Sequence, residues 1–164
     1  MRAVILADTH VPSRARSLPD PLWAAIDVAD VVLHAGDWTS AALVTEVAAR
    51  ARLVGCWGNN DGDDVRALLP EVARVTLGGV RVAVVHETGA AAGRERRMAK
   101  AFPDVDLLVF GHSHIPWDSR APGGPRLLNP GSPTDKRRQP VATWVEASFE
   151  GGEVEIAWRS PTAV

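Results

Sequence analysis

The chain has 164 residues, of which 46% are hydrophobic, so it can bury a sizeable core, and we expect residues 1–164 to form a single domain. Its formal net charge of -2 gives no overall field that would select nucleic acid, so we expect no specific nucleic-acid partner. The only cysteine, Cys56, cannot form an internal disulfide and favours a reducing compartment. No apolar run suits a signal peptide or a membrane span, so we expect a cytoplasmic protein with no membrane partner.

The first third of the chain alternates between patterns typical of strands and of helices. Short apolar runs bounded by Gly, Asp or Asn predict buried strands over 2–7, 31–34 and 52–55. Asp20 followed by Pro21 predicts a helix start with a side-chain cap, and Thr39 or Ser40 predicts the cap of a second helix. The resulting β-α-β-α-β order predicts that the three strands pair in parallel.

The rest of the chain has a different pattern, with turns that favour antiparallel pairing. Strands are predicted over 72–77, 80–86, 107–110, 126–129, 141–149 and 153–159, and helices over 64–69 and 91–101. Gly78-Gly79 and Gly151-Gly152 predict hairpin turns, and the Pro- and Gly-rich stretch 115–126 predicts a loop. We therefore expect two sheets packed face to face, with helices outside.

Five of the apolar runs end in side chains that can bind metal. Because ligands gather beyond the carboxyl ends of parallel strands, these side chains are expected to share one cleft. The candidate ligands are Asp8, His10, Asp37, Asn59, His86, His112 and His114. Seven ligands exceed what one tetrahedral site can use, so the set predicts two divalent ions, with the Asp37 carboxylate shared between them.

Each motif taken singly has a plainer explanation. Asp-x-His occurs often by chance, Gly-Asp and Gly-Asn-Asn are common turns, and His86 could be a hydrogen-bonded core histidine. Two histidines in Gly-His112-Ser-His114, however, have no packing reason to follow a buried strand. The five motifs together favour a metal centre. His34 lies inside a predicted buried strand, so we expect it to support the site rather than bind metal.

The order of these motifs resembles that of the calcineurin-like metallophosphoesterase superfamily, and in particular its small single-domain bacterial and archaeal phosphodiesterases. The motifs that carry the resemblance are Asp8-x-His10, Gly36-Asp37, Gly58-Asn59-x-Asp61, His86, Gly111-His112-x-His114 and Asn129-Pro130-Gly131-Ser132. The resemblance implies an α/β fold, a four-layer αββα sandwich of two mixed β-sheets flanked by helices, with a dinuclear site on one edge.

The resemblance also implies how the ligands divide. One ion would be held by Asp8, His10 and His114, the other by Asn59, His86 and His112, and Asp37 would bridge. Family members work with manganese, iron, nickel, cobalt or zinc, and we expect manganese here. The implied reaction is hydrolysis of a small phosphate ester, a phosphodiester, by in-line attack of a metal-bridging hydroxide. The residues expected to carry catalysis are His10, Asp37, Asn59 and Asp61, with Asp61 orienting His10 or a bound water.

Three positions depart from the family pattern. Asn60 stands where many larger members have a histidine, Glu87 replaces the usual glycine after His86, and Trp57 replaces a basic residue. Without an acid at position 60, we expect activated diesters to be hydrolysed faster than alkyl monoesters. The expected substrate contacts are Asn60, Trp57 and Arg137.

Several features stay open at this level. The cations Arg94, Arg96, Arg97 and Lys100 form either a solvated helix face or a phosphate-recruiting rim, and Trp38, Trp57 and Trp117 either pack or stack on substrate. The alternative to an enzyme is a protein-interaction scaffold of the same fold with a non-catalytic metal site, as in the retromer subunit, whose site is eroded. The intact ligand set favours the enzyme. Exposed strand edges, and the tendency of family members to form oligomers, are also consistent with a homo-oligomer.

Overall fold

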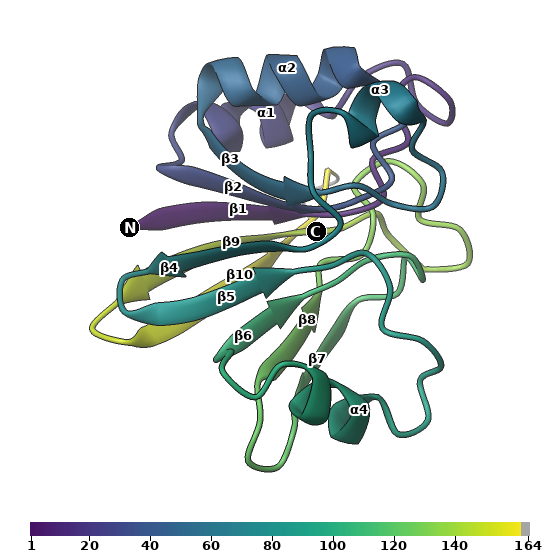
Figure 1. The fold of residues 1–164 in the computed structure, drawn as a ribbon. Coiled ribbons are helices and arrows are strands. Elements are labelled where there is room, and N and C mark those ends of the chain that lie inside the picture. Colours follow the sequence, from purple (N-terminus) through teal and green to yellow (C-terminus); the bar gives the residue numbers. More distant parts are fainter. Residues whose placement is uncertain (162–164) are drawn as a thin grey trace.

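The computed structural model describes residues 1–161 and contains two mixed β-sheets packed face to face, with helices on the outer faces (Figure 1). The first sheet has the order β10-β9-β1-β2-β3, formed by β1 (Arg2–Leu6), β2 (Val31–Ala35), β3 (Arg52–Cys56), β9 (Trp144–Glu150) and β10 (Glu153–Arg159). The second has the order β4-β5-β6-β8-β7, formed by β4 (Ala73–Leu77), β5 (Val80–Val84), β6 (Leu107–Val109), β7 (Trp117–Arg120) and β8 (Arg126–Asn129).

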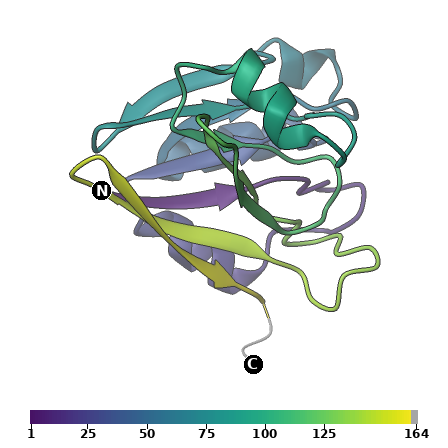
Figure 2. The ribbon, with the colours of Figure 1, turned by 90° about the horizontal axis from the view of Figure 1, so that it is seen from below.

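Four helices accompany the sheets: α1 (Asp20–Asp27), α2 (Ala41–Arg50), α3 (Asp63–Arg66) and α4 (Arg94–Ala101). The first two cover the outer face of the first sheet, and α4 covers the outer face of the second (Figure 2). The expected αββα sandwich is therefore confirmed. In residues 1–161 no helix is long and apolar enough to cross a bilayer.

Pairing within each sheet follows the predicted pattern. The strands β1, β2 and β3 run in parallel, as do β5, β6 and β8. Hairpins join β4 to β5 at Gly78-Gly79 and β9 to β10 at Gly151-Gly152. Five parallel strands, β1, β2, β3, β5 and β6, consequently end at one edge of the sandwich (Figure 1).

Two local expectations were wrong. Stretch 115–126 contains β7, which pairs with β8 as an edge strand, so its side chains alternate between half-buried and exposed. Asp20 does not cap α1: Pro19 occupies the N-cap position without a side-chain hydrogen bond, and Asp20 is the first helical residue. The second helix follows the prediction, because the Ser40 hydroxyl accepts a hydrogen bond from the Ala42 N–H.

Three apolar clusters hold the layers together. The largest lies between the sheets and includes Ile5, Leu33, Val109 and Phe149, all buried. A second joins α1 and α2 to the outer face of β1 and β2, and a third packs Met98 of α4 on the second sheet. With both faces of β1, β2, β5 and β6 covered, the loops at their carboxyl ends are fixed by the core on either side.

Candidate metal centre

Asp37 follows β2 and lies between the two groups of candidate ligands. Its Oδ2 is 3.5 Å from His10 Nε2, and its Oδ1 is 3.3 Å from His86 Nε2. The Asp37 side chain is 1% exposed, so the carboxylate faces the protein rather than solvent. One carboxylate thus separates two imidazoles, which is the arrangement that a ligand shared by two ions requires.

The first ligand group consists of Asp8, His10 and His114, all buried, with one ligand atom of each within 4.8 Å of the others. His10 Nε2 is 3.2 Å from His114 Nε2, which is 3.7 Å from Asp8 Oδ1. His114 Nδ1 donates to the Asp135 carbonyl at 2.6 Å. That hydrogen bond fixes the proton on Nδ1 and leaves the Nε2 lone pair facing the cleft.

The second group consists of Asn59, His86 and His112. The Asn59 Oδ1 is 2.9 Å from His86 Nε2 and 3.0 Å from His112 Nδ1. His86 Nδ1 donates to the Ala35 carbonyl at 2.7 Å, so its Nε2 lone pair also faces the cleft. Glu87, noted in the sequence only as a departure from the family pattern, places Oε1 3.7 Å from His112 Nδ1 and could join this group.

The backbone of the site is held in a conformation that ordinary residues avoid. Five of the seven candidate ligands have positive φ: Asp8 (53°), His10 (45°), Asp37 (60°), His112 (69°) and His114 (59°). Each such residue costs on the order of 1 kcal/mol or more, so it persists only where surrounding structure imposes it. This clustering indicates that the loops are shaped for binding rather than for packing alone.

The donors fit a pair of first-row divalent cations. Asp8 Oδ1 accepts from the His112 N–H, but Asp8 Oδ2 is buried without a hydrogen-bond partner. Burial, reinforced by the charge of Asp37, raises the pKa of Asp8 to about 7 in the absence of a cation. A cation at Oδ2 would offset that cost. Imidazole nitrogens mixed with carboxylate and amide oxygens also suit manganese, iron or zinc better than magnesium.

The pKa directions of His10, His114 and Asp37 agree with ligand chemistry, whereas the Asp37 carboxylate overcomes burial and raises the pKa of His86. Burial lowers the pKa of His114 to about 4 and also lowers that of His10, so both rings are neutral near pH 7, the form that binds metal. Burial opposes ionisation of Asp37, yet the nearby His86 imidazole and two hydrogen bonds from Asn60 hold its pKa well below the usual range.

Comparison with known proteins assigns the family. A model of the calcineurin-like phosphoesterase superfamily domain matches residues 1–151. The chain belongs to this superfamily. A probable metallophosphoesterase of Methanothermobacter thermautotrophicus is 32% identical over 139 residues, which cover 81% of this chain and 77% of that protein.

Two solved structures of the calcineurin-like fold illustrate its range. A Thermotoga maritima protein is 30% identical, covers 97% of this chain and 98% of its own, and superposes with a TM-score of 0.77. Wild-type Vps29 from Entamoeba histolytica, complexed with Zn²⁺, is 21% identical, covers 99% and 100%, and has a TM-score of 0.76. The Vps29 likeness shows the fold alone.

The Asp61 carboxylate contacts backbone N–H groups rather than His10, one of the two partners expected for it. It accepts hydrogen bonds from three backbone N–H groups, those of Asp37 (3.0 Å), Thr39 (2.7 Å) and Gly58 (2.7 Å). It therefore clamps the two loops of this calcineurin-like site together instead of orienting His10. The Gly58 backbone must approach the Asp37 side chain closely, because a Cβ added to Gly58 would collide with the Asp37 carboxylate.

His34 supports the site, in agreement with its predicted role. Its Nδ1 accepts from the Gly36 N–H at 3.2 Å, so Nε2 carries the proton and donates to the Thr9 hydroxyl at 3.1 Å. Both ring nitrogens are therefore occupied. Trp38 stacks on the His34 ring at 3.5 Å and is fully buried, so it packs in the core and cannot stack on substrate.

The cations of α4 are divided between packing and a solvated face. Arg94 is buried and lies over the rings of Phe110 and Trp117, so it is not part of a solvated face, and it covers one face of the half-buried Trp117. Arg97 donates to the carbonyls of Thr88, Ala90 and Ala92 and so supports the loop after His86. Only Arg96 and Lys100 of this group stay exposed without such contacts.

Two cavities flank the candidate metal centre of this superfamily member. One of about 540 Å³ is lined by His10, Ser13, Arg14, Thr39, Asn60, Asp135 and Arg137. The other, about 330 Å³, is lined by Trp57, Asn59, Glu71, Val72, Val85, His86, Glu87 and Phe102. The predicted substrate contacts are thus divided, with Asn60 and Arg137 on one flank and Trp57 on the other. The side chains that sequence reasoning missed, Arg14 and Asp135, carry no motif of their own.

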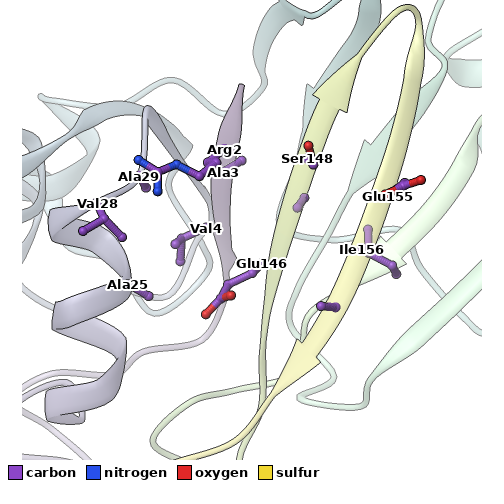
Figure 3. Close-up of a pocket in the computed structure, with 12 residues that line it drawn as sticks. Arg2, Ala3, Val4, Ala25, Val28, Ala29, Glu146, Ser148, Glu155 and Ile156 are labelled. Carbon is purple, nitrogen blue, oxygen red and sulfur yellow. The ribbon is translucent and has the colours of Figure 1, made fainter.

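A third hollow, about 360 Å³, lies between α1 and the β9-β10 hairpin (Figure 3). Its walls include Arg2 and Ala3 at the amino end of β1, whereas the candidate ligands Asp8 and His10 follow the carboxyl end of that strand. It is therefore separate from the metal centre.

Proposed function

We propose that this member of the superfamily is a dimetal-dependent phosphodiesterase. The observation that carries the proposal is the place of Asp37, whose two oxygens lie 3.5 Å and 3.3 Å from imidazoles of the two ligand groups. The ligands proposed for one ion are Asp8, His10, Asp37 and His114, and for the other Asn59, Asp37, His86 and His112. We expect manganese in both positions, with iron, nickel, cobalt or zinc as substitutes.

Bound divalent ions would supply Lewis acidity, lowering the pKa of water and withdrawing charge from phosphoryl oxygens. The protein supplies orientation. Asn60 donates from its backbone N–H to Asp37 Oδ1 (2.9 Å) and from its side chain to Asp37 Oδ2 (2.6 Å), so it fixes the carboxylate plane. Asp61 fixes the Asp37 backbone. Both residues thereby hold the shared ligand in one geometry.

The side chain at position 60 also limits the range of substrates. Asn60 has an amide, which cannot transfer a proton to a leaving group at neutral pH. The leaving group must then depart as an anion, so an activated diester such as bis-p-nitrophenyl phosphate is expected to react faster than an alkyl monoester. Equal kcat/KM values for the two classes would contradict this role of Asn60.

The alternative function is a protein-interaction scaffold with a non-catalytic metal site. The likeness to Vps29 in complex with Zn²⁺ supports considering it, because that protein combines this fold with a bound metal. The unpartnered Asp8 Oδ2 and the complete set of seven donors weigh toward the enzyme. We place the reaction in the cytoplasm, the compartment that the unpaired, buried Cys56 suits.

Elemental analysis combined with a manganese-dependent assay on bis-p-nitrophenyl phosphate separates the two functions. Two metal ions per chain together with turnover support the enzyme, provided that Asp37→Asn or His112→Ala abolishes the turnover and lowers the metal content. Asp20→Asn, which changes an exposed carboxylate at the start of α1, serves as the matched control and should keep both. One zinc ion per chain without turnover would establish the scaffold instead.

A further inference from the structure

Two unpaired guanidinium groups line the larger cavity beside the metal centre. Arg14 and Arg137 border this cavity together with His10 and Asn60. Within residues 1–161 neither guanidinium forms a salt bridge, whereas other arginines, such as Arg81, do. Arginines that face a cavity without a protein partner are available to an anion.

Both arginines sit on segments that are tied to the metal-binding loops. The Arg14 N–H donates to the His10 carbonyl at 2.7 Å, which places it one turn beyond that ligand. Arg137 follows a loop in which Ser132 Oγ donates to the Asp8 carbonyl (2.7 Å) and Thr134 Oγ1 to the Thr9 carbonyl (2.6 Å). The position of each arginine backbone relative to the centre is therefore fixed by the fold.

The charge of this cavity favours an anion. Among the described residues that line it, Asp135 is the only acid, with Oδ2 3.9 Å from His114 Nδ1, so two guanidinium groups face one carboxylate. The hydroxyls of Ser13 and Thr39 already donate to backbone carbonyls. The guanidinium groups are consequently the cationic donors that remain for a ligand.

The cavity on the opposite flank, lined by Trp57, has acidic rather than basic side chains in its wall. Its wall contains Trp57, Phe102 and Val72, with Glu71 and Glu87, and no Lys or Arg of residues 1–161 lines it. Trp57 is itself covered by the Arg66 guanidinium at 4.0 Å, which supports the ring from one side. An anionic group of a substrate would be repelled there, so the two arms of a bound diester would be distinguished by charge.

We propose that Arg14 and Arg137 form a subsite for a second phosphate group, so that the preferred substrates are phosphodiesters that carry a further phosphate on the arm beside His10. This inference rests on the proposed phosphodiesterase function, because it takes the scissile phosphate to lie at Asp37. Guanidinium groups bind phosphate oxygens through two parallel hydrogen bonds, which gives both attraction and orientation.

The test uses two substrates with the same leaving group, on the manganese-loaded full chain. They are thymidine 5′-(p-nitrophenyl phosphate) and the same compound with a 3′-phosphate. The subsite predicts a kcat/KM about tenfold higher for the 3′-phosphorylated substrate, the effect of one charge-assisted phosphate contact. In Arg14→Ala and Arg137→Ala the ratio should fall toward one. Arg138→Ala, an exposed neighbour that does not line the cavity, should keep it.

A binding measurement keeps this inference separate from the proposed reaction. Calorimetric titration with thymidine 3′,5′-bisphosphate and thymidine 5′-monophosphate should give about tenfold tighter binding of the bisphosphate, reduced by each arginine substitution. If neither p-nitrophenyl substrate is hydrolysed, the proposed function fails and the subsite is decided by these Kd values. Equal Kd values for the two nucleotides, or a preference that survives both substitutions, would overturn the subsite.

Discussion

The shared carboxylate depends on residues that would not touch the metals. Asp37 is held through its backbone by Asp61 and through its oxygens by Asn60. Gly58 leaves room for it, since any side chain there would occupy the carboxylate's place. These contacts fix one rotamer and one backbone conformation, and a site for two ions requires both.

Replacing Asp61 by asparagine tests the loop clamp. The amide retains one acceptor oxygen, so at least one of the three N–H groups loses its partner, and we expect a loss of about 1–3 kcal/mol in the free energy of unfolding. We also expect weaker manganese binding, measured by calorimetry. Asp20→Asn provides the control for a change of one surface charge. Unchanged stability and affinity in Asp61→Asn would show that the clamp has no such role.

The strands and the ligands that follow them can be predicted from local sequence, but the contacts that hold them in place cannot. The strands β1, β2 and β3 are short apolar runs with ligand-bearing loops, and this pattern suffices to predict a shared edge. The edge strand β7 was missed because its polar residues become a strand only by pairing with β8. The burial of Arg94 under two rings arises from contacts far apart in the chain, which no local pattern records.

The hydrogen bonds that hold the candidate metal centre in shape could not be predicted from the sequence either. Asp61 reaches the Asp37 and Thr39 backbone across more than 20 residues, and Thr134 reaches Thr9 across 125. Backbone acceptors and donors impose no residue type on their partners, so such contacts leave little trace in a sequence. Ligand identity could therefore be predicted, whereas the clamp and the cationic cavity required the folded molecule.

The strand β2 illustrates how the core positions the site. Leu33 is fully buried between the sheets, three residues before Gly36, where the loop that carries Asp37 begins. We expect Leu33→Ala to lower the free energy of unfolding by about 2–5 kcal/mol, because it leaves a cavity that the packed sheets cannot fill. The same change at Leu68, which is 55% exposed, should cost less than about 0.5 kcal/mol. Urea unfolding measures both, and similar costs would contradict this account of the core.

Across the whole molecule, the ligands come from both sheets. Asp8, His10, Asp37 and Asn59 follow strands of the first sheet, while His86, His112 and His114 follow strands of the second. Two bound ions would therefore connect the sheets at the edge of the sandwich, opposite the end where Met1 meets Phe149 (Figure 2). A homo-oligomer stays a prediction, with β10 as an available edge strand.

Removal of metal tests this connection. A ligand that binds only the folded chain stabilises it, by about 2.7 kcal/mol per site at about 100 times its Kd. We expect manganese to raise the melting temperature, a chelator to reverse the increase, and Asp37→Asn to lose most of it. Calorimetric melting of the chelated and reloaded protein measures the shift. An identical melting temperature with and without manganese would argue against ligands that join the sheets.

Anomalous diffraction from crystals of the manganese-loaded protein tests the central claim most directly. We predict two manganese peaks, one bound by Asp8, His10 and His114, the other by Asn59, His86 and His112, with Asp37 bound to both. A single peak, or two peaks that do not share Asp37, would contradict the dinuclear centre and the phosphodiesterase built on it.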